Sequence, residues 1–267
     1  MMARLVLLPL VVGCGRLSFD HGAAADAAVP DASPDAASPD LAAGCVVALT
    51  LEEPTWTGAA GEVLNGCNPT LNGTAVQGAQ RIDDPVRGRV GDLPLPSGCI
   101  HLPDAPTLHA TTGLTLSAWI YPRSLDGKNP YGVIAKRTDF TMDDAEYTMF
   151  VWTDNTVWVD IDSLNDRNHG TRQLANGQWQ MITAVYDGTL PTAQRVTIYV
   201  NGAHDATLPE TSASLTPYPS SLSIGCLPEQ PATKPQIALG GEIDLPAIWT
   251  RALSAQEVGA LYETTRR

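Results

Sequence analysis

Short stretches in which apolar and polar residues alternate recur along the chain from residue 45 onward. In LTLSAWIYP (114–122), Leu114, Leu116, Ala118 and Ile120 alternate with threonine, serine and tryptophan. Because side chains of a strand point to opposite faces in turn, this period of two predicts a strand with one face on the core. Comparable stretches predict further strands at 45–52, 70–80, 98–104, 131–137, 146–152, 156–161, 178–188, 195–208, 221–226 and 241–249.

Turn and helix motifs complete this picture. Asn201-Gly202 separates two predicted strands and favours a type I′ hairpin turn. Ser254 and Glu257 have the spacing of a capping box, which predicts a short helix near the C-terminal end. Many short strands at close spacing, with only this helix, predict an all-β fold. We expect a two-sheet antiparallel jelly-roll sandwich with one short C-terminal helix.

Composition agrees with strands joined by many turns. The chain has 23 glycines and 21 prolines, and only 17 % of its residues are charged. Its net charge of -13 would repel a phosphate backbone, so we expect no nucleic-acid partner. The acidity would attract divalent cations, or it simply keeps an exported protein soluble.

The first residues indicate export. A short basic start to Arg4 precedes an apolar run at 5–12, too short to span a bilayer as a helix. The run ends at Cys14 in a sequence that resembles the lipobox of bacterial lipoproteins. This resemblance implies a lipoprotein signal peptide at 1–13 and acylation of Cys14, which anchors the chain to a membrane. The expected location is the outer membrane or cell surface of a bacterium. The alternative is an ordinary signal peptide with a chance cysteine.

Residues 14–44 are expected to form a disordered tether. The segment AAADAAVPDASPDAASPDLAAG (23–44) has almost nothing to bury, so it cannot offset the entropy lost on ordering. Proline and repelling carboxylates would keep it extended as a spacer. The pattern of strands then indicates one domain at 45–267, which we expect to be monomeric.

The cysteine count fits an exported domain. With Cys14 assigned to the lipid, four of the five cysteines remain, an even number in an oxidising compartment. We expect two disulfides, and the three possible pairings stay open. A Cys-x-x-Cys spacing is absent from the sequence, which argues against zinc and redox sites. The four cysteines are Cys45, Cys67, Cys99 and Cys226.

The closing segment GGEIDLPAIWTRALSAQEVGALYE (240–263) resembles that of LamG-like jelly-roll domains in the concanavalin A-like lectin and glucanase superfamily. The segments 114–122, 176–188, 196–202 and 222–225 resemble further strands of that family, in the same order. The resemblance covers roughly 46–265. It departs from the family at Pro246 and in the early loop 64–73.

Two tryptophans and an arginine in these segments have structural roles that follow without the resemblance. We expect Trp119 and Trp179 to pack between the two sheets, where a large ring fills space. Arg251 is expected to pair with a carboxylate or to hold loop carbonyls.

The closing strand also resembles the catalytic strand of family 16 glycoside hydrolases, in which Glu-x-Asp is soon followed by a second Glu. Glu242 and Asp244 match the first two acids, but residues 245–248 contain no acid that would donate the proton. The five histidines are scattered and suggest no nucleophilic triad. We therefore expect no enzymatic activity, and a glycoside hydrolase is the least favoured alternative.

A calcium site is a second candidate. Glu53 follows the first predicted strand and Asp244 lies in the last one. The two strands are neighbours in the fold that the resemblance implies, and carboxylate oxygens suit Ca²⁺. We expect no required cofactor, with Ca²⁺ at these two residues as the candidate ion. The alternative is that these acids are solvated or cap backbone amides.

The predicted hairpin at 146–161 and the loop after it carry the best candidate ligand surface. Exposed aromatic faces beside polar groups would bind polysaccharide or a surface protein. The alternatives are that both tryptophans pack inward, and that the domain is a structural or adhesion scaffold without a small ligand. The candidate residues are Trp152, Trp158, Asp160, Asp162, Arg167 and His169.

Overall fold

The computed structural model describes residues 40–140, 145–162, 168–229 and 237–267. All of them belong to one compact unit, Ala36–Arg267. The predicted signal peptide, Cys14 and most of the predicted tether lie outside the described residues. Within the described part of the chain, no helix is long and apolar enough to cross a membrane.

One antiparallel sheet of this unit contains both the first and the last strand. Its strands are β1 (Cys45–Ala48), β3 (Gln80–Asp84), β4 (Gly88–Leu93), β6 (Gly113–Pro122), β11 (Gln180–Asp187), β12 (Val196–Val200), β13 (Ala203–Leu208) and β17 (Gly241–Trp249). Among the described residues it is eight-stranded, in the order β13-β12-β11-β6-β17-β4-β3, with β1 paired to β17. The expected pairing of first and last strand is therefore confirmed.

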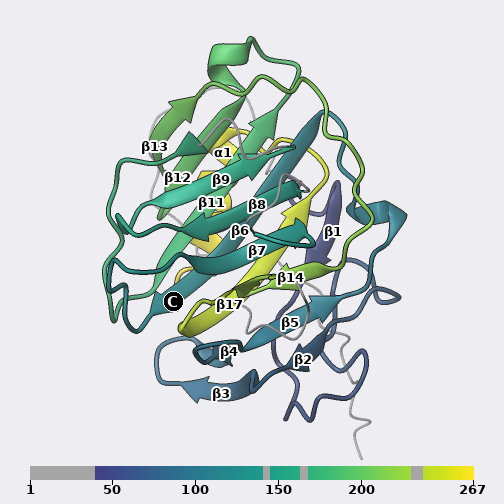
Figure 1. Ribbon diagram of the computed structural model, residues 1–267, viewed down its shortest axis with the longest axis vertical. Coiled ribbons are helices and arrows are strands. Elements are labelled where there is room, and N and C mark those ends of the chain that lie inside the picture. Colours follow the sequence, from purple (N-terminus) through teal and green to yellow (C-terminus); the bar gives the residue numbers. More distant parts are fainter. Residues whose placement is uncertain (1–39, 141–144, 163–167, 230–236) are drawn as a thin grey trace, which may run out of the picture. The chain divides into compact units, whose positions relative to one another are not determined.

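The second large sheet lies face to face with the first. Its strands are β2 (Thr74–Val76), β5 (Cys99–Leu102), β7 (Tyr131–Arg137), β8 (Ala145–Val151), β9 (Val157–Ile161), β10 (Asn168–His169) and β14 (Leu222–Ile224). Their order is β10-β9-β8-β7-β14-β5-β2. In Figure 1, β7, β8 and β14 cross in front of β6 and β17 of the other sheet.

Short elements complete the described fold. These are the strand pair β15 (Cys226–Leu227) and β16 (Ile237–Ala238), the 3-10 turns η1 (Pro106–Leu108) and η2 (Thr192–Gln194), and the helix α1 (Ala255–Thr265). The predicted turn at Asn201-Gly202 is present, and both residues have the positive φ that a type I′ turn requires, 54° and 72°. The two-sheet jelly-roll sandwich with one short C-terminal α-helix is confirmed.

Period-two patterning explains how the two sheets share a core. In β6, Leu116 and Ile120 point inward, and in β8 Met149 and Val151 point inward to meet the same cluster. Burying each such side chain contributes about 1.5–3 kcal/mol to folding. The residues between them in sequence therefore lie on the outer face of each sheet.

The outer face of the eight-stranded sheet is covered in part by α1. Val258 of the helix belongs to a second apolar cluster, together with Val185 of β11 and Trp249 of β17. The predicted capping box is present: the Ser254 hydroxyl accepts a bond from the Glu257 amide, and the Glu257 carboxylate accepts from the Ser254 amide. This fixes where the helix begins.

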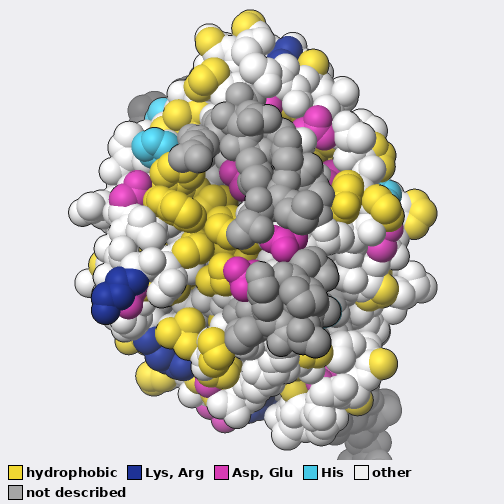
Figure 2. Space-filling view, in the orientation of Figure 1, with side chains coloured by type: hydrophobic (Ala, Val, Ile, Leu, Met, Phe, Trp, Pro, Cys, Tyr) yellow, Lys and Arg dark blue, Asp and Glu magenta, His cyan; other side chains and the backbone are white. Residues whose placement is uncertain are grey.

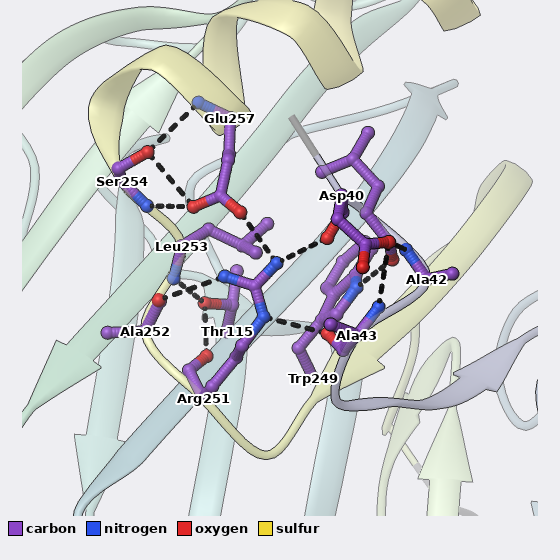
Figure 3. Close-up of polar contacts among 11 residues, drawn as sticks. Asp40, Ala42, Ala43, Thr115, Trp249, Arg251, Ala252, Leu253, Ser254 and Glu257 are labelled. Carbon is purple, nitrogen blue, oxygen red and sulfur yellow. Dashed lines mark hydrogen bonds and ion pairs between the residues drawn. The ribbon is translucent and has the colours of Figure 1, made fainter. Parts of the chain in front are cut away.

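The domain begins earlier than the predicted boundary at residue 45. Leu41 is only 6 % exposed, and its carbonyl accepts a hydrogen bond of 2.8 Å from Nε1 of Trp249. Figure 3 shows the preceding Asp40 beside Arg251, which donates to the carbonyls of Asp40 and Ala43. Residues 40–44 are therefore part of the domain, because the last strand supplies donors for their backbone carbonyls.

Two disulfides settle the pairing that the sequence left open. Cys45 is bonded to Cys67 and Cys99 to Cys226, with Cα–Cα distances of 5.8 and 5.4 Å. The second bond joins residues that are 127 positions apart, so it ties late strands to early ones.

Candidate ligand-binding site

The β8–β9 hairpin presents its aromatic residues on the outer face of the seven-stranded sheet. Phe150 lies directly opposite Trp158 in the strand register. Since Met149, Val157 and Val159 point into the core, Phe150 and Trp158 point away from it. The alternative that the tryptophans pack between the sheets is therefore wrong.

Together, Phe140, Phe150, Trp152, Trp158 and His169 form what we call the aromatic face. The ring centroids of Trp152 and Trp158 are 5.5 Å apart, with 40° between the ring planes. Phe140 and Phe150 contact each other edge to face at 5.2 Å behind Trp152. Both tryptophans are half-buried. Figure 2 shows hydrophobic side chains gathered on this face over β8 and β9.

Trp158 is held in place by the turn that joins the two strands. Its Nε1 donates to the Thr156 hydroxyl at 3.0 Å and to the Asp154 carboxylate at 3.3 Å. Partial burial opposes ionisation of Asp154, but hydrogen bonds from the Thr156 amide and hydroxyl and from Trp158 outweigh it and lower the Asp154 pKa. The carboxylate thus stays charged and fixes both the turn and the indole ring.

His169 extends the aromatic face onto β10. It pairs with Trp158 in the β9–β10 register, and the imidazole stacks on the indole at 4.6 Å with 16° between the planes. The imidazole is exposed, and its Nδ1 lies 2.9 Å from the carbonyl of Gly170. Three predicted surface residues, Trp152, Trp158 and His169, are therefore brought together.

The other predicted surface residues have different places. Asp160 lies on the same outer face as Trp158, but it is only 5 % exposed and forms an ion pair of 3.1 Å with Nη1 of Arg137. Asp162 accepts a hydrogen bond from the amide of Thr216 and so holds a neighbouring loop. Arg167 lies outside the described residues. Asp160 and Asp162, which were predicted as candidate ligand-surface residues, thus both have partners within the domain.

A cleft of about 310 Å³ lies near the aromatic face. Ile237 lines this cleft and also packs against the apolar cluster that includes Phe150 and borders Trp152. The cleft offers polar groups as well as apolar ones. Its described lining residues are Leu95, Pro96, Ser124, Asp126, Asn129, Pro130, Tyr131 and Ile237.

The glucanase-like acids of β17 are neutralised by arginines. On the outer face of the eight-stranded sheet, Glu242 accepts a bond of 2.8 Å from Arg123, which also binds Asp92 across the strand pair at 2.6 Å. Asp244 is paired with Arg87 at 2.7 Å, and both side chains are 1 % exposed. Burial raises the pKa of Asp244, and the charge of Arg87 limits this rise. Both carboxylates of the Glu-x-Asp pattern are thus built into ion pairs with arginines.

The two calcium candidates have separate partners. The Glu53 carboxylate accepts from the amide of Leu64 at 2.7 Å and from Nε1 of Trp56 at 3.2 Å, while Asp244 binds Arg87. Glu53 thus caps backbone and indole donors, as the alternative interpretation expected. In the described residues, the cluster of three candidate metal ligands is Cys99, His101 and Cys226, whose two cysteines are joined in a disulfide.

Sequence reasoning missed two residues that matter here. Phe140 completes the aromatic face, but a lone phenylalanine after a strand carries no pattern that predicts this. Arg87 lies in the turn between β3 and β4. This hairpin was not predicted because its first strand, QRIDD, is mostly polar. The Asp-Pro and Arg-Gly pairs at 84–88 are a turn signal that would have located it.

Solved structures with similar folds are binding domains or parts of glycan-processing proteins. A botulinum neurotoxin type C structure, described by the dependence of cell entry on two ganglioside molecules, matches with a TM-score of 0.61 and 10 % identity over 84 % of this chain and 52 % of that one. This chain thus spans about half of the neurotoxin chain. Domain 4 of AbnA, a GH43 extracellular arabinanase from Geobacillus stearothermophilus in complex with arabinotriose, matches with a TM-score of 0.57 and 16 % identity over 82 % of this chain and 98 % of that domain.

A sialidase from Trypanosoma rangeli has a TM-score of 0.55 and 14 % identity, over 82 % of this chain and 32 % of the sialidase. At these identities the likeness concerns the fold. No curated protein sequence matches the chain. Residues 97–259 match the family described as the concanavalin A-like lectin/glucanases superfamily, and the match spans more than half of the chain. The chain therefore belongs to the concanavalin A-like lectin/glucanases superfamily.

Proposed function

We propose that this domain is a non-catalytic binding module that recognises polysaccharide through the aromatic face. The observation that carries the proposal is the arrangement of Trp152, Trp158 and His169. These three rings contact one another in sequence, at 5.5 and 4.6 Å, on the outer side of a rigid sheet. Sugar rings have apolar C–H faces, and an aromatic ring that is supported from behind loses little entropy when a sugar packs on it.

The cleft lined by Ser124, Asp126 and Asn129 supports the same proposal. Hydroxyl, carboxylate and amide groups there offer the few oriented polar contacts that ligand sites combine with apolar walls. A glycan of several units would pack one sugar on the tryptophans and reach the cleft with another. Two of the similar structures concern sugar-containing ligands: the arabinanase domain is in complex with arabinotriose, and cell entry of the neurotoxin depends on gangliosides. A glycan ligand for this domain agrees with both.

A glycan array of neutral oligosaccharides, probed with the purified protein, tests the proposal. We expect Trp152→Ala and Trp158→Ala each to weaken binding about tenfold or more, because such rings act as binding hot spots. Tyr218→Ala is the matched control, since Tyr218 is also half-buried but lies outside the aromatic face and the cleft. The array is read with Ca²⁺ and with EDTA, which tests the Glu53 and Asp244 candidates at the same time.

Two results would overturn this function. One is that the protein binds no neutral glycan. The other is that Trp152→Ala and Trp158→Ala bind as tightly as the unaltered protein. Capture of a surface protein that depends on Trp158, without glycan binding, would instead support the alternative of a protein partner.

We propose further that the module is displayed on a membrane through an acylated Cys14, with the segment up to residue 39 as its spacer. The basic start, the apolar run and the lipobox-like sequence support this display. Mass spectrometry of the membrane-extracted protein should find an acylated N-terminal Cys14. Release of unacylated protein from wild-type cells, equal to that from a Cys14→Ser strain, would contradict it.

A further inference from the structure

A second hollow lies on the opposite side of the sandwich from the aromatic face. We call it the Arg87 pocket. Its volume is about 510 Å³, within the range of sites that hold small ligands. Its described lining residues are Val86, Arg87, Trp119, Trp179, Tyr262, Arg266 and Arg267.

The pocket forms because Trp119 and Trp179 point outward from the eight-stranded sheet. The neighbours of Trp119 in β6, Ala118 and Ile120, point into the core, so the indole lies on the outer face. Trp119 stacks on Tyr262 of α1 at 5.6 Å, and Nε1 of Trp119 donates to the Thr265 hydroxyl at 2.9 Å. The expectation that these tryptophans fill space between the sheets is therefore wrong, because strand alternation places them on the other face.

Arg87 forms a fixed, buried floor for this pocket. Its guanidinium carbon lies 4.1 Å from the centre of the Trp119 ring and 5.3 Å from that of Trp179. Nε donates to Asp244 and Nη2 donates to the carbonyl of Thr265 at 3.1 Å. Among the described residues, the remaining nitrogen, Nη1, has no acceptor. A side chain that is 1 % exposed thus offers a donor at the pocket that the domain itself leaves unused.

The charge of the pocket wall contrasts with that of the chain. The chain carries a net charge of -13, yet the described wall has three arginines and no aspartate or glutamate. Three acids next to this wall are already bound to its residues: Asp244 to Arg87, Glu263 to Arg266 at 2.7 Å, and Asp84 to Nε1 of Trp179 at 3.2 Å. A local set of cations in an acidic protein favours an anionic ligand.

We propose that the Arg87 pocket binds a carboxylated sugar residue, such as a uronic acid unit of an acidic polysaccharide. The carboxylate would accept hydrogen bonds from Arg87 Nη1 and from Arg266 or Arg267, since arginine binds planar carboxylates strongly. The sugar ring would pack on the half-buried Trp179, since the Tyr262 ring already stacks on Trp119 and lies under Arg266. A small inorganic anion would use the cations but leave the aromatic walls uncovered.

Isothermal titration with trigalacturonate and with its trimethyl ester tests the proposal. The two probes have the same sugar rings and differ in charge. We expect trigalacturonate to bind about tenfold or more tightly than the ester, and added salt to weaken its binding. Arg267→Glu and Trp179→Ala should each reduce the affinity by about tenfold or more.

The choice of variants keeps the result interpretable. Arg87→Gln leaves the buried Asp244 without its partner, so the exposed Arg267 carries the charge test. Arg172→Glu makes the same charge change at an exposed arginine outside the pocket; it is the matched control and should leave trigalacturonate binding unchanged. The aromatic face is tested by neutral glycans and Trp158→Ala, and the Arg87 pocket by the charge of trigalacturonate and Arg267→Glu, so the two proposals fail separately.

Three results would overturn the second site. The first is equal affinity for trigalacturonate and its ester. The second is trigalacturonate binding that Arg267→Glu and Trp179→Ala leave intact. The third is that an acidic peptide, such as a glutamate trimer, binds as tightly as trigalacturonate, which would make the pocket a site for acidic protein segments.

Discussion

At the scale of single residues, arginines decide what the carboxylates of this domain do. Arg87 neutralises Asp244, Arg123 joins Glu242 to Asp92, and Arg251 binds Glu257. The sequence predicted Arg251 as a structural residue because it follows the last strand, and its contacts with loop carbonyls and a carboxylate confirm this. The sequence could not predict that Arg87 pairs with Asp244, because 157 positions separate the two residues.

Arg251 should be among the most sensitive polar positions. Its guanidinium donates to Asp40, Ala43 and Glu257 from one planar group, as Figure 3 shows. Lysine lacks this fork, so we expect Arg251→Lys to lower the free energy of unfolding by about 2–3 kcal/mol. Urea denaturation measures this change. The exposed Arg266→Lys should change stability by less than about 1 kcal/mol, and equal effects of the two would contradict the role of Arg251.

The buried pair Arg87–Asp244 makes a different prediction. In Asp244→Asn the Arg87 charge stays buried without its counter-ion, so we expect a loss of about 3–5 kcal/mol in the free energy of unfolding. Glu263→Gln, which breaks the exposed pair with Arg266, should cost no more than about 1 kcal/mol. Thermal and urea unfolding of both variants compare the two. Similar small losses would show that Asp244 is not needed to neutralise Arg87.

At the scale of elements, period-two alternation located the strands that have one face on the core. β6 was predicted almost to its ends because each inward residue is apolar and most outward ones are polar. The hairpin of β3 and β4 was missed, since β3 is QRIDD and lies at a sheet edge where little is buried. The candidate surface could be predicted to the same extent. Alternation along β8 and β9 places the aromatic side chains on one face. The partners of Asp160 and Asp162 could not be predicted, because they come from other segments of the chain.

The start of helix α1 should make the domain sensitive to acid. The hydrogen bond from Arg251 is the main cause that lowers the pKa of Glu257 below its ordinary value of 4.5. The ionised carboxylate therefore stabilises the fold above pH 4.5, and this contribution is lost as the pH falls through the lower folded-state pKa.

We expect Glu257→Gln to be less stable than the unaltered protein at pH 7, and this difference to narrow as the pH falls below 4.5. Urea unfolding at a series of pH values measures the gap. Glu263→Gln at the exposed end of the helix serves as the control, with little difference at any pH. If the difference in free energy of unfolding between Glu257→Gln and the unaltered protein stays constant from pH 7 to below pH 4.5, the ionised Glu257 carboxylate does not stabilise the fold as argued.

At the scale of the whole molecule, the sandwich places two different aromatic surfaces on opposite sides of one core. The sequence predicted the two layers, because alternating strands must bury one face each. It could not assign the cysteine pairs, because these depend on how strands far apart in sequence align. The side of Trp119, in contrast, follows from the alternation in 114–122, which places it opposite Leu116 and Ile120, and the expectation of a core role overlooked this. The two proposed sites follow from this arrangement, as the aromatic face belongs to the seven-stranded sheet and the Arg87 pocket to the other.

The two disulfides should stabilise this arrangement to different degrees. A crosslink restricts the unfolded chain more when it closes a longer loop. Separations of 22 and 127 residues correspond to about 3.5 and about 5 kcal/mol in the chain-entropy model. The bond between Cys99 and Cys226 should therefore contribute more than the bond between Cys45 and Cys67.

Two double variants measure the contribution of each disulfide to the free energy of unfolding. The design removes the effect of the cavities that the substitutions create. Cys45→Ala with Cys67→Ala leaves the long-loop bond, and Cys99→Ala with Cys226→Ala leaves the short-loop bond. Each variant is unfolded in urea in its oxidised and its reduced form, so the substitutions cancel within each comparison. Reduction should cost about 5 kcal/mol in the first variant and about 3.5 kcal/mol in the second. Equal costs, or the reverse order, would mean that native contacts at each bond outweigh the restriction of the unfolded chain.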